Sequence, residues 1–209
     1  MIELCEWPPT RSQRAKWVLE ELGADYTSRM INLLEGRQNS DSYRALHPLG
    51  VVPALKTDDY TIFESVAIVL QLIDEHPETG LAPAVGTPDR AAYYQWSVFA
   101  GTEMDPAIMM YFDNALRPLE GMRPPGRQHD AVFADYGRQD FMLRADILST
   151  ALSDRDYLLG AEFSGADILI GHSCFMATHV GLPIGDFPVL QAYYERLQQR
   201  PGHRRAYGG

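Results

Sequence analysis

Hydrophobic and polar positions follow two different periods in the first third of the chain. Between Ala15 and Leu22 the apolar residues recur at i, i+3, i+4 and i+7, which predicts a helix that ends at Gly23. A second stripe of this kind runs from Ser65 to His76, and a weak polar helix is predicted over 38–46. Short apolar runs typical of strands lie at 2–7, 25–31, 51–57 and 60–63. The resulting order, β-α-β-α-β-β-α, predicts a small mixed sheet with helices packed on it.

The pattern changes after residue 77. Residues 78–87 are rich in Gly, Pro and Ala and are typical of a linker. Beyond Thr87, a suitable N-cap before Pro88, the sequence predicts helices and no strands. These helices span about 88–115, 128–152, 164–179 and 188–200. We therefore expect an α/β domain at 1–77, a linker at 78–87 and an all-helical domain at 88–209.

The start of the helix predicted over 164–179 can be described in detail. Ser164 stands at the N-cap and Asp167 at the third helical position, which is a capping box with Asp in place of the usual Glu. The residues that follow are apolar enough for the helix to be buried.

Composition and charge narrow the class of protein. The 209 residues are 45% hydrophobic and carry a formal net charge of -10, which is typical of a soluble globular protein and unfavourable for binding nucleic acid or anionic lipid. Cys5 and Cys174 are far apart, so neither a disulfide framework nor a metal site is expected. We found no signal-like N-terminus and no apolar stretch of about 20 residues, which favours a cytoplasmic protein without a membrane span. A basic cluster near the C-terminus is interpreted as a solvated face: Arg196, Arg200, Arg204 and Arg205.

Several motifs occur in a specific order: LEELG at 19–23, HPLGVVPAL at 47–55, ES at 64–65 followed by AI, YLLG at 157–160 and FSGADI at 163–168. Together they resemble the glutathione transferase superfamily, of the bacterial type, over essentially the whole chain. The resemblance implies a thioredoxin-like N-terminal domain, an all-α helical-bundle C-terminal domain and a homodimer. It also implies glutathione as co-substrate.

The resemblance places glutathione on two of these motifs. In similar proteins the bond before Pro53 is cis, and the Val52 backbone pairs with the cysteinyl part of glutathione. Because proline cannot donate to a sheet, Pro53 must lie at a strand edge or start, and the motif could also be a strand entry alone. Ser65, at a helix start, would bind the γ-glutamyl carboxylate, while Glu64 would accept from the ammonium. The alternative is that Ser65 only caps its helix.

The stretch WPPTRSQRAKW at 7–17 contains the candidates for activating the glutathione thiol. Aligned on LEELG, the serine of serine-type enzymes falls on Thr10, and the cysteine of cysteine-type enzymes falls on Arg11. Thr10 also fits a capping box with Gln13, but capping uses the hydroxyl oxygen and leaves its hydrogen free to donate. We rank Thr10 first, Ser12 second, and Arg11 third as a cation near the thiolate.

The helix after the linker is crowded with aromatic residues and methionines. Met109, Tyr111 and Phe112, beyond a kink expected at Pro106, are candidates for the wall of an electrophile pocket, although core packing also explains such residues. In similar dimers an acidic residue of this helix reaches the neighbour's glutathione. Glu103 or Asp105 could do so, or could be an exposed helix carboxylate only.

Three functions fit these features. The first is conjugation of glutathione to small hydrophobic electrophiles, as in detoxification. The second is glutathione-dependent reduction of disulfides or peroxides. The third is a non-catalytic interaction protein that keeps the fold.

Overall fold

The computed structural model describes residues 1–116 and 128–208, which form two compact units. The first unit contains residues 1–82 together with 198–209, and the second contains residues 83–197. The junction at 82/83 falls inside the linker expected at 78–87. The expected helical domain, 88–209, differs from the structure at its end, because the last twelve residues belong to the first unit.

The first unit is built on a sheet with the order β2-β1-β3-β4. β1 pairs in parallel with β2, and β3 pairs antiparallel with both β1 and β4. The predicted strands and the thioredoxin-like α/β fold are thus confirmed. The strands are β1 (Ile2–Glu6), β2 (Tyr26–Met30), β3 (Ala54–Lys56) and β4 (Thr61–Phe63).

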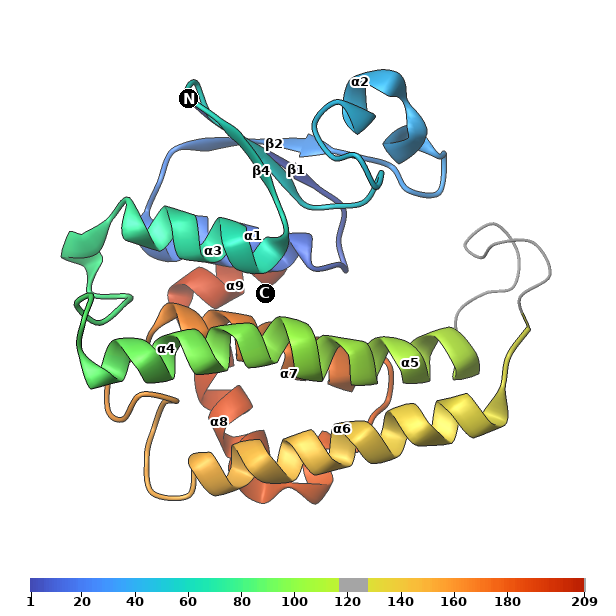
Figure 1. Cartoon of the computed structure of the whole chain (residues 1–209), viewed down its shortest axis with the longest axis vertical. Helices are drawn as coiled ribbons and strands as arrows, with labels where there is room; N and C mark the ends of the chain where they lie inside the picture. Colours follow the sequence, from blue (N-terminus) through green and yellow to red (C-terminus); the bar gives the residue numbers. More distant parts are fainter. Residues whose placement is uncertain (117–127, 209) are drawn as a thin grey trace. The chain divides into compact units, whose positions relative to one another are not determined.

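Helices cover both faces of this sheet (Figure 1). α1 (Ser12–Leu22) and α3 (Ser65–Asp74) pack beside each other on one face. The short α2 (Asp41–Arg44) supplies Tyr43 to a buried cluster on the other face, where it meets Cys5 and Ala54. The side chains of successive strand residues point to opposite faces, so each strand contributes to both layers.

A helix that the periodicity did not predict, α9 (Pro201–Tyr207), packs against α1. Arg200, just before it, donates from Nε and Nη2 to the two carboxylate oxygens of Glu21, both at 2.9 Å. Arg205 donates from Nε to Glu20 at 2.6 Å. The interpretation of the basic cluster as a solvated face is therefore wrong for Arg200, which is half-buried against Glu21, whereas Arg205 is exposed. Both arginines join the end of the chain to α1.

Helices are the main regular elements among the described residues of the second unit, as expected, and the one β pairing among them is an isolated bridge between Tyr157 and Gly160. Its helices are α4 (Pro88–Phe99), α5 (Asp105–Ala115), α6 (Ala131–Ala151), α7 (Gly165–His179) and α8 (Pro188–Gln198), with a π-helical turn at Ala100–Met104 between α4 and α5. Thr87 caps α4 by accepting from the Arg90 amide, as predicted. Among residues 1–116 and 128–208, no helix combines the length and apolar character that a membrane span requires.

The predicted capping box at the start of α7 is confirmed. The Asp167 carboxylate is fully buried and accepts from the amides of Ser164 and Leu158, at 2.8 and 2.9 Å. It also accepts from the hydroxyls of Ser164 and Tyr193. A carboxylate with four donors fixes the start of a helix whose first ten residues are all buried.

Candidate functional site

The register of the sheet brings three connections of the first unit to one end. Cys5 of β1 lies opposite Ala54 of β3, and Ala54 lies opposite Phe63 of β4. β1 and β4 reach this row at their C-terminal ends, whereas β3 begins there. The segments directly beyond the row therefore meet at the same end of the sheet: 7–11, 51–53 and 64–65. Each of them carries residues that the sequence predicted for the site.

The middle segment contains a cis bond between Val52 and Pro53, as the resemblance implied. Pro53 directly precedes β3, so its lack of an amide hydrogen removes no ladder hydrogen bond. Tyr43 of α2 donates its hydroxyl to the Val51 carbonyl at 2.6 Å. Val52 belongs to the same buried cluster as Tyr43, and Trp7 packs against that cluster. The segment is thus held from α2 and from the end of β1.

The segment after β4 has a constrained backbone. Glu64 adopts a φ of 74°, the only positive φ of a non-glycine residue among the described ones. Such a conformation costs a residue with a β-carbon about 1 to 3 kcal/mol, and it is found preferentially at functional sites. Glu64 is exposed, whereas Ser65, the first residue of α3, is 5% exposed. The two residues therefore present a carboxylate and a helix N-terminus side by side.

Ser65 has a partner that the sequence analysis missed. Arg14 of α1 is completely buried and donates from Nη1 to Ser65 Oγ at 3.3 Å. Because the hydroxyl oxygen accepts from the guanidinium, the Ser65 hydrogen can point elsewhere. One feature of the sequence could have indicated this contact: Arg14 lies one turn before Val18, so a charged residue falls on the apolar face of α1.

His47 is a second residue that sequence analysis left without a role. Its ring lies 4.7 Å from that of Phe63 and is 2% exposed. Burial lowers the pKa of His47, and the nearby Glu64 carboxylate partly counteracts this effect. His47 thus borders the site on the side of Glu64. In the sequence, only its position in the HPLG motif indicated that it lies near the site.

Thr10 and Ser12 lie together at the start of α1. Their hydroxyl oxygens are 2.8 Å apart, and Thr10 Oγ1 accepts from the Ser12 amide at 3.2 Å. The helix begins at Ser12 with Arg11 at the N-cap position, one residue later than the predicted cap, Thr10. The capping box predicted for Thr10 is wrong, because the Gln13 amide bonds to the Thr10 carbonyl and Gln13 Oε1 has no hydrogen-bond partner. Arg11 is exposed at this end of the helix.

Both cysteines are buried, and Cys5 packs in the same cluster as Val52. Cys5 is buried in β1, where desolvation raises the pKa of its thiol to about 11. Cys174 is buried in α7, and burial raises its pKa to about 12. Thiols with such pKa values are almost entirely protonated near neutral pH and are poor nucleophiles.

Comparison with known families identifies the chain. The sequence profile described as "Glutathione S-transferase, N-terminal domain" matches residues 2–74, and that described as "Glutathione S-transferase, C-terminal domain" matches residues 99–201. The chain belongs to the glutathione S-transferase family. The profile of the N-terminal domain spans all three connections at the end of the sheet.

Curated relatives support the assignment to this family. The chain is 26% identical to glutathione S-transferase Z2 of Arabidopsis thaliana over 207 residues, which cover 96% of this chain and 87% of the relative. It is 28% identical to glutathione S-transferase GstA of Escherichia coli O157:H7, covering 88% of this chain and 86% of the relative.

Solved structures of the same family have the same fold as this chain. A sphingomonad glutathione S-transferase complexed with glutathione is 27% identical, with a TM-score of 0.83 and coverage of 99% of this chain and 97% of the other. The bacterial transferase BphK, solved as a ternary complex, is 26% identical with a TM-score of 0.85, covering 99% and 98% of the two chains.

The predicted pocket residues of the helical unit do not all line one hollow. Met109 lines a hollow of about 550 Å³ together with Met110 and Phe133, between α5 and the start of α6. Tyr111 and Phe112 are half-buried on α5 and are not part of this lining. The structure therefore brings Met109 alone of the three to this hollow.

The two candidate cross-subunit acids differ in their surroundings. Asp105 is 7% exposed and accepts from the Ser173 hydroxyl at 3.1 Å within the helical unit. The side chain of Glu103 is 43% exposed and accepts from Arg144 of α6 at 2.9 Å. Glu103 is thus the member of the pair that presents a carboxylate at the surface.

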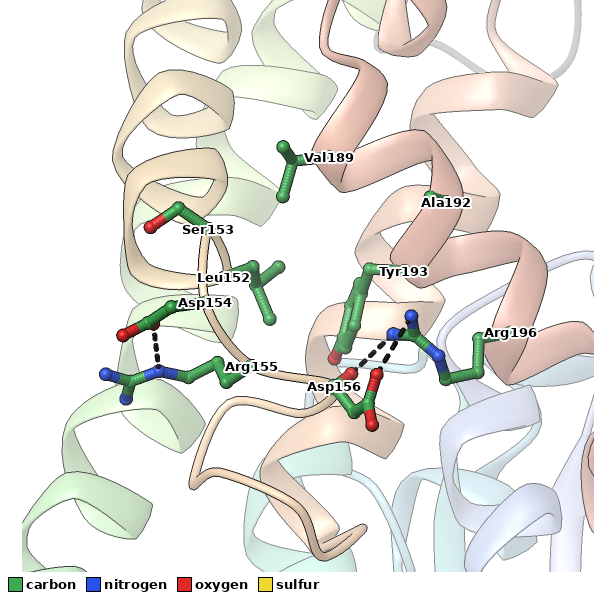
Figure 2. Close-up of a pocket in the computed structure, with 9 residues that line it drawn as sticks. All are labelled: Leu152, Ser153, Asp154, Arg155, Asp156, Val189, Ala192, Tyr193 and Arg196. Carbon is green, nitrogen blue, oxygen red and sulfur yellow. Dashed lines mark hydrogen bonds and ion pairs between the residues drawn. The ribbon is translucent and has the colours of Figure 1, made fainter.

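Another hollow in the helical unit, of about 370 Å³, lies between the end of α6 and α8 (Figure 2). Leu152, Val189 and Tyr193 form its apolar part. Its two arginines are ion-paired: Arg196 with Asp156 at 3.1 Å, and Arg155 with Asp154 at 3.2 Å. The charges that border this hollow are already engaged with each other.

Proposed function

We propose that this chain binds glutathione across the end of its sheet and adds the thiolate to small hydrophobic electrophiles. The observation that supports this most is the register row Cys5, Ala54 and Phe63. Through this row the segments 7–11, 51–53 and 64–65, which contain the residues we propose for thiol activation and glutathione binding, lie at one end of one sheet.

Each segment offers a group that suits a different part of the tripeptide. The backbone of Val52, before the cis proline, would pair with the cysteinyl residue as an extra strand would. Ser65 would donate to the γ-glutamyl carboxylate, since its oxygen already accepts from Arg14 and its hydrogen can point outward. Glu64 would accept from the γ-glutamyl ammonium.

The thiol would be activated by a side-chain hydroxyl. Lowering a thiol pKa from about 8.5 by about 2 units takes roughly 2.7 kcal/mol of preferential thiolate stabilisation. The amides of Ser12, Gln13 and Arg14 already donate to oxygens of Thr10 and Arg11. The hydroxyl of Thr10, a half-buried residue just before the helix, is therefore the donor we assign to the sulfur, with the exposed Arg11 as a nearby positive charge.

The competing functions have less support. Reduction of disulfides through a protein thiol would need a reactive cysteine, and burial raises the pKa of both Cys5 and Cys174. A non-catalytic interaction protein would have no use for the constrained backbone of Glu64 or for a buried arginine on Ser65. Both alternatives remain outcomes of the test below.

The proposal also includes a second copy of the chain and the electrophilic substrate. We propose a homodimer in which Glu103, the more exposed of the two candidate acids, reaches the neighbour's glutathione. We also propose that Met109 contributes to binding of the electrophile, since the flexible Met110 and the aromatic ring of Phe133 line the same hollow. The cytoplasm remains the expected compartment.

The Ser65→Ala variant tests the glutathione site. Loss of a hydrogen bond to a carboxylate costs about 1.5 kcal/mol or more, so we expect at least a tenfold weaker Kd for glutathione by titration calorimetry. Ser149→Ala on α6, which removes a hydroxyl bonded to its own helix, serves as control and should bind as the parent does.

Turnover assays then separate the three functions. Conjugation of an aryl halide without consumption of a disulfide substrate supports the transferase. Disulfide reduction without conjugation would point to the reductase, and absence of glutathione binding at millimolar concentration would point to the interaction protein.

A further inference from the structure

The hydrogen bonds around Ser12 leave its hydroxyl hydrogen only two acceptors among the described groups. Ser12 Oγ accepts from the Trp7 amide at 3.2 Å, which uses one lone pair of the oxygen. Its own hydrogen can go to Thr10 Oγ1 at 2.8 Å or to the Trp7 carbonyl at 3.4 Å. The shorter distance favours Thr10 as the acceptor.

The Thr10 hydroxyl oxygen also has its lone pairs occupied. It accepts from the Ser12 amide at 3.2 Å. If it also accepts from the Ser12 hydroxyl, both lone pairs of Thr10 Oγ1 are used. The hydrogen of Thr10 then has to point away from Ser12, and Thr10 is half-buried, not fully buried.

We propose that Ser12 is a positioning residue that orients and polarises the Thr10 hydroxyl, so that Thr10 donates its hydrogen to the sulfur of glutathione. This inference rests on the function proposed above. Ser12 itself does not touch the sulfur, because it is completely buried, whereas Thr10 is only half-buried.

The arrangement is a short chain of donors that ends at the ligand. The Trp7 amide donates to Ser12, Ser12 donates to Thr10, and Thr10 donates to the thiolate. Hydrogen bonds in such a chain strengthen one another, because each donor that also accepts a bond becomes more polar. Ser12 therefore lowers the pKa of the bound thiol through Thr10 and has no independent effect on it.

A double-mutant cycle tests this dependence. The variants are Thr10→Val, Ser12→Ala and the combination, and the readout is the pKa of bound glutathione from its ultraviolet thiolate absorbance. We expect Thr10→Val to raise this pKa by about 1 unit or more and Ser12→Ala to raise it by about half as much. The combined variant should match Thr10→Val alone, because Ser12 has nothing to act on once Thr10 lacks its hydroxyl.

Additive effects of the two substitutions would overturn the inference, because they would mean that Ser12 reaches the sulfur independently. An unchanged pKa in Ser12→Ala would overturn it as well. Ser149→Ala, remote in the sequence and on α6, is the control and should leave the pKa as in the parent chain.

A second measurement, the affinity for a glutathione analogue, distinguishes an effect of Ser12 on the Thr10 hydroxyl from an effect on the shape of the loop. S-methylglutathione carries no thiol, so its Kd reports the binding surface and not the thiolate. Ser12→Ala should change this Kd less than twofold, whereas a tenfold loss would mean that Ser12 only holds the loop in shape. If the parent chain binds neither ligand, the proposed function fails and this inference fails with it. If it binds both and only the cycle fails, the proposed function stands.

Discussion

At the scale of single residues, His203 shows how a buried ring can make stability depend on pH. It is 6% exposed, stacks on Tyr207 at 4.3 Å and meets the edge of Trp17 at 4.8 Å. Burial lowers the pKa of His203 to about 4, against a weaker opposing effect of Glu21. The folded first unit therefore contains a neutral imidazole at pH values where an unfolded chain would have protonated it.

This difference predicts a specific loss of stability in acid. The pKa in the unfolded chain is about 6.5, so the unfolded state binds more protons than the folded state between pH 4 and 6.5. The stabilisation is complete above about pH 6.5 and is lost as the pH falls toward 4, by up to about 3 kcal/mol. His203→Phe keeps an aromatic ring that cannot be protonated, and should lose correspondingly less stability between pH 7 and pH 4.5.

Denaturant unfolding at both pH values measures the effect. Carboxylates titrate in the same range in both proteins, so the difference between the two chains isolates His203. His179→Phe, on the exposed end of α7, is the control and should show the pH dependence of the parent chain. An equal loss in the parent and in His203→Phe would contradict the prediction.

At the scale of elements, local patterns predicted most of the fold, and contacts distant in sequence explain the exceptions. The stripe from Ala15 to Leu22, the N-cap Thr87 and the capping box at Ser164 depend on residues within one or two turns, and all three features are present. α9 has only seven residues and starts at a proline, so its pattern is too short to be recognised alone. Arg200, just before α9, and Arg205, within it, bond to Glu21 and Glu20, about 180 positions earlier in the chain.

In the candidate site, too, some residues could be predicted from local sequence motifs and others could not. Val52, Pro53, Glu64 and Ser65 lie in short motifs that resemblance alone could identify. The roles of Arg14 and of the hydroxyl pair at Thr10 and Ser12 depend on donor and acceptor distances, which sequence spacing does not determine.

The contact between α5 and α6 depends on a single glycine. A β-carbon at Gly137 would lie 2.4 Å from the Tyr111 amide nitrogen and 3.0 Å from the Ala107 carbonyl oxygen, both of them backbone atoms of α5. Helix propensity favours alanine here by about 1 kcal/mol, but the clash requires the two helices to separate. Gly137→Ala should therefore destabilise the chain by roughly 2 kcal/mol or more, lowering Tm by about 6 °C.

Gly185→Ala is the matched control. Gly185 has no positive φ, and a β-carbon there would meet no atom within 4 Å. Differential scanning fluorimetry should find its Tm within about 2 °C of the parent chain, consistent with a surface substitution of small effect. A Tm for Gly137→Ala at or above that of the parent would contradict the close approach of the helices.

At the scale of the whole molecule, the first unit is made from both ends of the chain. α9 covers Trp17, which is fully buried in α1, and Gly202 lies so close to Glu21 that a β-carbon would meet its carboxylate at 2.6 Å. α1 also carries Ser12 and Arg14 of the candidate site. The C-terminal segment should therefore affect the glutathione site through α1, although it contributes no residue to that site.

Removal of the residues after Gln198 tests this dependence. The deletion leaves Trp17 uncovered and Glu21 without Arg200, which together should cost about 3 kcal/mol or more and lower Tm by roughly 10 °C. Glutathione should bind at least tenfold more weakly even though every proposed contact residue is present. Arg200→Met keeps the chain length and removes one ion pair, so a smaller loss in the same direction is expected from it. Arg204→Ala, an exposed residue bonded to Gln198 and Gln199, should resemble the parent.

Hydrogen exchange decides which unit the C-terminal segment stabilises. If residues 198–209 were an extension of the helical domain, as the boundary 88–209 implies, their removal would increase amide exchange in α7 and leave α1 protected. The packing of α9 on α1 predicts the opposite: faster exchange in peptides from α1, and unchanged exchange in α7, whose start is fixed by the four hydrogen bonds to Asp167. Faster exchange in α7 alone, with glutathione binding intact, would contradict the assignment of the segment to the first unit.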